Sequence, residues 1–411
     1  MPKENIVIAI RTYGRIDTIE ANTLSVVKDL GLPIYIFCGT DEVKEYRKKF
    51  RKEGYKIRDG KGPNGLTEAN KAIYKHFNIN QKLLLCDDDL KAFWELQDDK
   101  LVKGDLLKYI LRGFKECEDN NFKLFGFYPV RSSRYMNGRK EITKGLNFCV
   151  GGMNGIINDK ELINHTSLKE DYERSVQHYI KYGGSIRFNQ AHIQHGIYTK
   201  KGGLSSMRTQ DKMKEECDYL LKEYPNYIAV KKSKSEYTEI QLKQIKYSIA
   251  HHLLANLRLI TWSNNCSRPN VSGKDETRSR EGRLVGKPCL SYTFGYLRPR
   301  RAKKGTLELT RVSERFPFVY NLIKEWLKEL KPDFIYSAIC VNKNIKCEPH
   351  KDKYNTRLSL AVGLGDYTGG NLIIEGVKHN INNKPLEFDG NKTHWNDDFE
   401  GERFSFIFIH H

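Results

Sequence analysis

The chain of 411 residues carries 70 Lys and Arg against 51 Asp and Glu, a formal net charge of +19. This length predicts two domains, and the excess of cations favours a polyanionic partner such as nucleic acid, although a Lys-, Asn- and Ile-rich composition also fits an AT-rich genome. The apolar runs are only of strand length, which excludes a membrane span, and the N-terminus has no apolar leader, which predicts an intracellular protein. Nine Cys without a Cys-x-x-Cys pair predict reduced thiols rather than a thiolate zinc site or a disulfide framework.

The first part of the chain alternates predicted strands and helices. Apolar runs predict strands at 6–10, 34–38, 55–57 and 82–85, and helical spacing predicts helices at 17–30, 41–52 and 67–76. This alternation implies a parallel sheet wrapped by helices. Ligands bind such sheets at the carboxyl ends of the strands, so the residues that follow each strand are the candidates for a site.

Two of these strand ends carry chemistry. Arg11-Thr12-Tyr13-Gly14-Arg15 follows the first strand, and Asp87-Asp88-Asp89 follows the fourth. Adjacent carboxylates repel one another, and a hard divalent metal held by Asp87 and Asp89 on the phosphates of a nucleotide would neutralise them. A solvated acidic loop is the alternative.

Further along, the small residues at Gly151-Gly152 would let the backbone approach a ligand. Asp171, in Glu170-Asp171-Tyr172-Glu173, opens an amphipathic helix that ends near Gly183. This carboxylate is either a catalytic base or an ordinary helix N-terminal acid favoured by the macrodipole. His195, which precedes Gly202-Gly203-Leu204-Ser205-Ser206, is either a further metal ligand or a structural histidine.

The early β-α-β-α-β unit that closes on Asp-x-Asp resembles the GT-A fold of nucleotide-sugar glycosyltransferases. The order of the motifs over about 5–224 is similar to that in glycosyltransferases associated with TET/JBP oxygenases. The resemblance implies that the first strand end, with Thr12 and Arg15, contacts the nucleotide base and ribose. It also implies Mn²⁺ or Mg²⁺ at Asp87 and Asp89 and a base at Asp171, with a nucleotide sugar, UDP-glucose in the first instance, as donor.

A polar segment after Tyr224-Pro225-Asn226 predicts a boundary between domains 1–230 and 231–411. Segments 240–257 and 318–330 predict helices, and the pattern changes to strands from Phe334 onward. The expected fold is α/β plus all-β: a GT-A-like Rossmannoid domain, then a double-stranded β-helix (jelly-roll) domain with flanking helices. The predicted core residues of the second domain are Ile335, Leu358, Leu360 and Leu372.

Basic stretches at 278–283 and 298–304 enclose three aromatic residues, Tyr292, Phe294 and Tyr296. Aromatic faces among phosphate-binding cations suit an extruded or single-stranded base. A solvated basic loop is the alternative.

Three residues near the end of the chain have the chemistry of a metal site. In a strand over 346–356, His350 and Asp352 project from the same face. With His394 they make two imidazoles and one carboxylate, the arrangement of non-haem Fe(II) oxygenases. In the final strand Arg403 and Ser405 share one face, opposite three phenylalanines, so a guanidinium fork points into a cavity and requires a carboxylate there.

The sequence of His350-x-Asp352, Gly365–Leu372, His394 and Arg403-x-Ser405 resembles the 2-oxoglutarate/Fe(II) dioxygenases. Asn355 is placed as in the TET/JBP branch, which oxidises the 5-methyl group of thymine or 5-methylcytosine in nucleic acid. The resemblance covers about 291–411, and it departs from the animal enzymes in the short spacing between His394 and Arg403. It implies Fe(II) on the His-Asp-His set, 2-oxoglutarate on Arg403 with Ser405 and Asn355, and O₂ as co-substrate.

Together the two domains predict a bifunctional enzyme. It would hydroxylate the 5-methyl group of thymine or 5-methylcytosine, in DNA rather than RNA, and transfer a sugar to the resulting hydroxymethyl group. No membrane and no obligate protein partner is expected. The alternatives are hydroxylation and glycosylation of protein side chains, or one active domain with the other serving as a nucleic-acid binding module.

Overall fold

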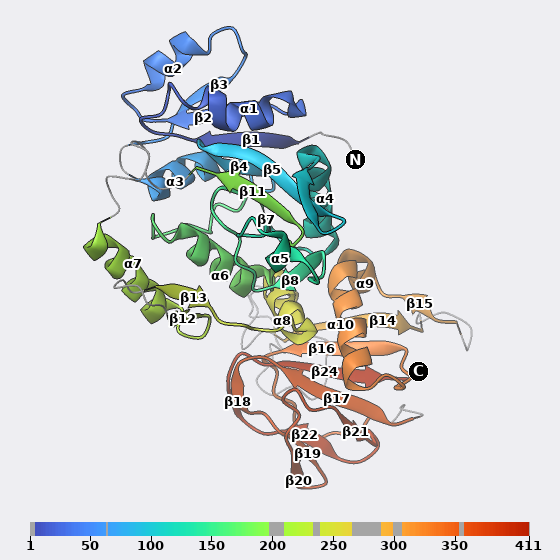
Figure 1. Ribbon diagram of the computed structural model, residues 1–411. Coiled ribbons are helices and arrows are strands. Elements are labelled where there is room, and N and C mark those ends of the chain that lie inside the picture. Colours follow the sequence, from blue (N-terminus) through green and yellow to red (C-terminus); the bar gives the residue numbers. More distant parts are fainter. Residues whose placement is uncertain are drawn as a thin grey trace, which may run out of the picture. The chain divides into compact units, whose positions relative to one another are not determined.

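The computed structural model describes residues 5–62, 65–196, 209–232, 239–264, 289–298, 306–352 and 357–410. The chain divides into two compact units, Met1–Ser248 and Ile249–His411 (Figure 1). The division lies later than the predicted 230/231 because strand β12 (Ile228–Val230) pairs with β13 (Ile240–Leu242) inside the first unit. The single helix predicted over 240–257 is therefore wrong: it is β13 followed by helix α8 (Ile249–Leu259).

The first unit alternates strands and helices, as predicted. Its remaining elements are β1 (Ile6–Arg11), η1 (Glu20–Leu24), α1 (Ser25–Val27), η2 (Lys28–Leu30), β2 (Ile34–Cys38), α2 (Val43–Lys49), β3 (Lys56–Asp59), α3 (Leu66–His76), β4 (Lys82–Asp87), β5 (Leu90–Gln97), β6 (Lys100–Lys103), α4 (Leu106–Asp119), β7 (Leu124–Phe127), α5 (Ser133–Met136), β8 (Ile142–Gly145), β9 (Met153–Ile157), α6 (Glu170–Tyr182), β10 (Ser185–Phe188), β11 (Ala191–His195) and α7 (Gln210–Glu223).

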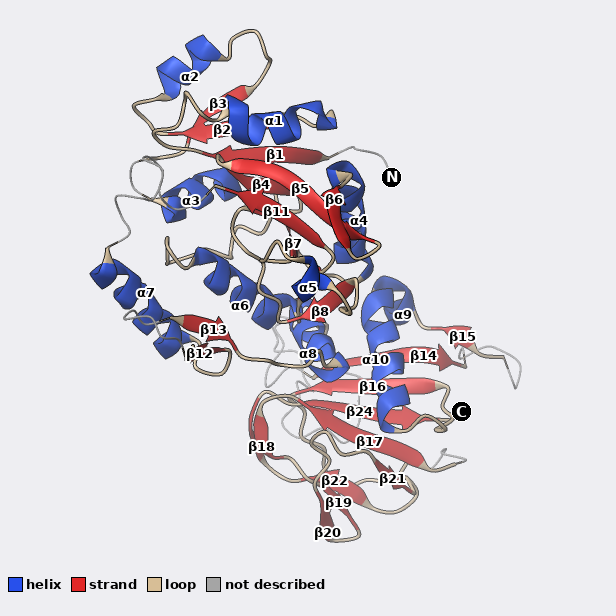
Figure 2. Cartoon of the chain, viewed as in Figure 1, coloured by secondary structure: helices blue, strands red, loops and turns tan. Residues whose placement is uncertain are grey.

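Its main sheet has eight strands in the order β3-β2-β1-β4-β9-β7-β10-β8. The first four are mutually parallel, β9 is antiparallel to both of its neighbours, and β7 and β10 are again parallel. Alternate residues of β1 enter different cores, since Ile8 clusters with residues of α4 and Ala9 clusters with residues of α3. Figure 2 shows the strands of this unit in red and its helices in blue. The parallel strand order β3-β2-β1-β4, with helices packed on both faces, is a Rossmann-like arrangement. The carboxyl ends of β1 and β4 lie side by side, with Arg11 in register with Asp87.

The second unit is largely β-structure with flanking helices. After α8 its elements are β14 (Leu290–Leu297), β15 (Glu308–Leu309), α9 (Arg311–Arg315), α10 (Pro317–Leu330), β16 (Ala338–Lys343), β17 (Ser359–Leu364), β18 (Tyr367–Gly369), β19 (Leu372–Ile374), β20 (Val377–His379), β21 (Leu386–Phe388), β22 (His394–Asn396), β23 (Phe399–Gly401) and β24 (Phe404–Ile409). They form a six-stranded sheet, β15-β14-β16-β24-β17-β21, and smaller sheets β20-β19-β22 and β18-β23. An all-β region is therefore present, and the double-stranded β-helix remains a prediction.

The core of this unit lies between the large sheet and its helices. The phenylalanines of β24 cluster with Trp326 of α10 and Leu253 of α8. Leu360 and Leu372 are buried as predicted, but the prediction was wrong for Ile335 and Leu358, which are 64% and 49% exposed. Both precede a strand instead of lying in it, so neither side chain is pressed against a sheet neighbour.

The eight cysteines within the described residues are free thiols. Across the same residues, no helix is both long and apolar enough to cross a membrane.

Candidate functional site

The structure brings His350, Asp352 and His394 together in the second unit. One ligand atom from each lies within 4.8 Å of the others. Over its described part, 346–352, the expected strand is wrong: Pro349 has no N–H to donate. The segment joins β22 through an isolated bridge between the two histidines and through the Cys347 N–H, which donates to Asn396 Oδ1 at 2.8 Å. Their backbones exchange hydrogen bonds of 3.0 and 2.9 Å, and the Asp352 N–H donates to Gly390 O at 2.7 Å. Backbone pairing therefore sets the separation of the imidazoles.

Hydrogen bonds also orient both rings. The Nδ1 of His350 lies 2.7 Å from the carbonyl of Glu348, and the Nδ1 of His394 lies 2.9 Å from that of Lys392. A carbonyl only accepts, so each Nδ1 carries the hydrogen and each Nε2 keeps its lone pair. Those Nε2 atoms lie 4.0 and 3.7 Å from the two carboxylate oxygens of Asp352. Burial lowers the pKa of His394, which keeps that imidazole in the neutral form that metals bind.

Arg403 is a buried cation without an acidic partner. Its side chain is 3% exposed, its Nε has no hydrogen-bond partner, and its Nη1 reaches only Ile345 O at 3.5 Å. No carboxylate in the described part of the chain forms an ion pair with it. The guanidinium lies 5.6 and 5.4 Å from the ring centres of Tyr367 and Phe399, and burial lowers the pKa of the group. An anionic ligand would satisfy this charge.

Two glycines make room for this arrangement. Gly370 has a φ of +64°, and a Cβ there would lie 2.7 Å from Arg403 Nε. A Cβ on Gly363 would lie 2.1 Å from the hydroxyl of Tyr367. That hydroxyl is buried beside Arg403, and no carbonyl or carboxylate of the described residues accepts its hydrogen, so it is a second donor next to the guanidinium. Tyr367 was not among the residues predicted for this site; its place in Gly365-Asp366-Tyr367 was the available signal.

Ser405 belongs to a buried polar row across the large sheet. Ser291 Oγ donates to Asn342 Oδ1 at 3.0 Å, and Asn342 Nδ2 donates to Ser405 Oγ at 3.3 Å. The row lies on the opposite face of β24 from the phenylalanine core, as alternation predicts. Asn355 and the predicted basic stretches, except Arg298, lie outside the described residues.

In the first unit, the predicted metal ligands are paired with arginines. Arg11 lies 2.5 Å from Asp87, and Arg15 lies 2.6 Å from Asp88 and 3.3 Å from Asp89. Burial raises the pKa of Asp88 to about 7 despite Arg15 and the Thr12 hydroxyl. Thr12 is itself buried, with its hydroxyl 3.0 Å from that of Tyr46. A cation at Asp87 and Asp89 would have to share or displace these guanidinium groups.

Thr23 shapes the acidic turn and was not predicted. It is fully buried, its hydroxyl donates to Asp87 O at 2.6 Å, and it accepts from the Leu90 N–H at 3.0 Å. Thr23 can reach both ends of the turn because the helix predicted over 17–30 is interrupted by a π-turn, with Asn22 at φ −104° and ψ −109°. Such turns recur at functional sites.

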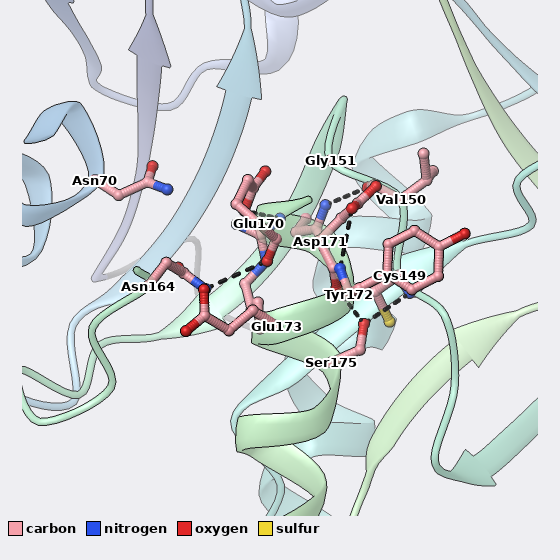
Figure 3. Close-up of polar contacts among 12 residues, drawn as sticks. Asn70, Cys149, Val150, Gly151, Asn164, Glu170, Asp171, Tyr172, Glu173 and Ser175 are labelled. Carbon is pink, nitrogen blue, oxygen red and sulfur yellow. Dashed lines mark hydrogen bonds and ion pairs between the residues drawn. The ribbon is translucent and has the colours of Figure 1, made fainter. Parts of the chain in front are cut away.

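Asp171 lies at the start of α6, beside the loop that carries Gly151 (Figure 3). Burial, and then the neighbouring charge of Glu170, raise the pKa of Asp171 to about 6. Glu170 is held between Arg11 at 3.5 Å and Arg174 at 2.7 Å. Arg11 also donates to Gly151 O at 2.9 Å. Arg11 thus connects the acidic turn, the glycine loop and the helix that carries Asp171.

Two buried glutamates hold the loop before α6. Glu173 accepts from the N–H groups of His165 and Thr166, and Glu216 of α7 accepts from those of residues 167–169. These contacts occupy both carboxylates. They have a structural role and fix where Asp171 lies.

His195 lies beside the acidic turn. A Cβ on Gly152 would lie 3.0 Å from the His195 ring, and the next residue, Gly196, donates to Asp89 O at 2.9 Å. Among the described residues these groups do not form a metal-ligand cluster of three. His192 is buried and lies 2.8 Å from Tyr128 O through its Nδ1, a structural histidine. The Gly202–Ser206 stretch lies outside the described residues.

Comparison with known proteins gives distant likenesses. No protein-family model and no curated protein matches the chain. Among solved structures, residues 1–349 of S. aureus TarS match at 12% identity and a TM-score of 0.29, over 53% of this chain and 65% of that one. CMP:2-keto-3-deoxy-manno-octonic acid synthetase complexed with CTP matches at 8% identity and a TM-score of 0.30, over 45% of this chain and 89% of that one. OsALKBH1 matches at 13% identity and a TM-score of 0.18, over 30% of this chain and 78% of that one.

These neighbours are glycosyltransferase- or nucleotidyltransferase-like folds and a 2-oxoglutarate dioxygenase. The chain spans slightly less than two thirds of the TarS fragment. Because every TM-score lies below 0.5, we base the function on the residues of this chain alone.

Proposed function

We propose that the chain is a bifunctional enzyme of nucleic-acid base modification. Its second unit hydroxylates the 5-methyl group of thymine or 5-methylcytosine with Fe(II), 2-oxoglutarate and O₂, and its first unit glycosylates the product. The observation that carries the proposal is the convergence of His350, Asp352 and His394 in the same unit as a buried, acid-free Arg403.

In the second unit the donor set fits iron, since two neutral imidazoles and one carboxylate leave coordination positions open. Bound iron would supply the activation of O₂, with one oxygen atom going to the methyl group and the other to succinate as CO₂ leaves. The protein would orient the co-substrate: Arg403 and the Tyr367 hydroxyl would donate to its distal carboxylate. Neither group has an acidic partner among the described residues, which supports this role.

In the first unit the proposed donor is a nucleotide sugar, UDP-glucose first. Asp171 would take the proton of the acceptor hydroxyl while its oxygen attacks the anomeric carbon and the nucleotide diphosphate leaves with the bonding electrons. The raised pKa of Asp171 suits a base near neutral pH. Mn²⁺ or Mg²⁺ at Asp87 and Asp89 would offset the charge of the leaving diphosphate.

Two features support the coupling of the halves. The hydroxymethyl product of one unit is the alcohol that the other requires. The net charge of +19 favours a polyanionic substrate over a protein side chain.

The test is mass spectrometry of nucleosides from thymine- and 5-methylcytosine-containing DNA incubated with the protein, Fe(II), 2-oxoglutarate and UDP-glucose. With the D171N variant we expect the modified nucleosides to gain one oxygen atom, about 16 Da. With the wild-type protein we expect them to gain one hexose in addition, about 162 Da. The H350A variant is expected to give neither. Unchanged nucleosides together with hydroxylated lysine or proline in added polypeptides would refute the proposal and favour a protein substrate.

A further inference from the structure

The first unit carries a basic and aromatic surface that was not predicted from the sequence. The segment from Tyr128 to Lys140 contains four cationic residues and no acid. Arg131, Arg134 and Lys140 are exposed, and in the described structure none of them forms an ion pair. Tyr135, on the short helix α5, has 56% of its surface exposed. Unpaired cations beside an exposed ring leave positive potential and a stacking face together.

A second aromatic residue extends this surface onto the small sheet β11-β5-β6. Trp94 is in register with Lys103, whose Nζ lies 4.5 Å from the ring centre, and Arg131 lies 5.3 Å from the same ring. Gln194 ties them together, because its Oε1 accepts from Trp94 Nε1 at 2.9 Å and from Arg131 Nη1 at 2.8 Å. The cations are therefore held in place around an indole.

The surface is continuous with the acidic turn. Gln194 precedes His195, which is in register with Leu90, and Gly196 donates to Asp89 O. Tyr128 follows the carboxyl end of β7, which runs parallel to β4 because each is antiparallel to β9. It therefore starts at the same sheet edge as Asp87. A single strand of nucleic acid bound to this surface would lead to the acidic turn, where the sugar would be transferred.

We propose that this surface, made of Trp94, Lys103, Arg131, Arg134, Tyr135 and Lys140, binds the acceptor as single-stranded or extruded nucleic acid. The inference rests on the proposed glycosyl transfer and names its acceptor class. An acidic polypeptide would need the cations alone, whereas the aromatic side chains suit stacked bases.

The test uses the full-length protein and a single-stranded oligonucleotide carrying 5-iodouracil, which cross-links to aromatic side chains on irradiation. We expect cross-linked peptides that contain Trp94 or Tyr135. In the variant K103A/R131A/R134A/K140A the yield of these cross-links is expected to fall about tenfold. The variant should also flatten the dependence of log affinity on log salt by up to about 3, since each phosphate contact to a single strand contributes about 0.7.

The matched control is R47A/K48A/R51A/K52A, which removes the same formal charge at and after α2 from exposed positions. It should keep the cross-links. Y135A should weaken binding about tenfold with an unchanged salt slope, because stacking is insensitive to counterions.

Cross-links confined to residues 249–411, equal losses in both quadruple variants, or displacement of the oligonucleotide by polyglutamate of equal charge would each overturn the inference. UDP-glucose hydrolysis without acceptor reports the donor chemistry separately. If that hydrolysis and base glycosylation are absent while the cross-links map as expected, the surface stands and the proposed function falls.

Discussion

Replacement of Arg403 by Met is expected to raise the stability of the ligand-free protein while abolishing tight binding of 2-oxoglutarate. A buried charge without a partner costs several kcal/mol, and the two ring contacts return about 0.5–2 kcal/mol each. Met keeps the apolar stem, so we expect a gain of about 1–2 kcal/mol. Loss of a two-pronged contact to a carboxylate removes at least about 3 kcal/mol of binding, or about 150-fold in affinity.

Urea unfolding and calorimetric titration of 2-oxoglutarate into Mn²⁺-loaded protein measure the two effects. Tryptophan fluorescence reports mainly the second unit, which holds three of the four tryptophans, Trp262, Trp326 and Trp395. The control is R258M: Arg258 forms surface ion pairs with Asp366 and Glu402, so its loss should change stability by about 0–1 kcal/mol and leave binding intact. Binding of 2-oxoglutarate by R403M within about threefold of wild type would refute the clamp.

Three further outcomes test the same sites. The H394A variant should bind no iron in a metal assay and should lose the stabilisation that iron gives, about 2.7 kcal/mol at an iron concentration of about a hundred times Kd. The control variant H379A should keep both, and equal iron contents in the two variants would contradict the assignment of His394 as a ligand. G370A should weaken 2-oxoglutarate binding because its Cβ would press on Arg403, whereas G376A has a similarly positive φ but open space, so calorimetry should show normal binding. The rate of glycosyl transfer should fall below about pH 6, with a slope of one in log rate against pH, because the carboxylate of Asp171, whose pKa is raised, becomes protonated. The D171N variant should lose about 10²–10⁴-fold in rate with unchanged affinity for UDP-glucose. A rate that does not change between about pH 5 and about pH 8 would argue for another base.

Periodicity was enough to predict the strands of the first unit. Continuous β-branched runs such as Ile6–Ile10 are buried on both faces of a parallel sheet, and such a run can be recognised in the sequence without knowing its tertiary contacts. Motifs at strand ends followed from it, because neighbouring parallel strands bring Arg11 and Asp87 to one edge whatever else the fold does. The His-Asp-His convergence was predicted from residue types, although the local strand assumed for it was wrong.

The rest depended on contacts between distant segments. A lone Thr23 inside a helical pattern has no signature, and its role exists only because the acidic turn lies against a π-turn. Leu358 is apolar and adjacent to a strand, so spacing could not tell it from a core residue. Glu173 likewise accepts from two backbone N–H groups, a kind of donor that every residue but proline offers.

The bridge between His350 and His394 has a consequence for how such sites diverge. Lengthening the chain between the two histidines costs only about 0.6 kcal/mol for each doubling of the loop, whereas a one-residue slip in either bridged segment turns an imidazole to the opposite face. Insertions of whole hairpins between the two histidines should therefore be tolerated, whereas a shift of either histidine by one position should not. Relatives of this protein should be sought by strand pairing, since the number of residues between their histidines will vary.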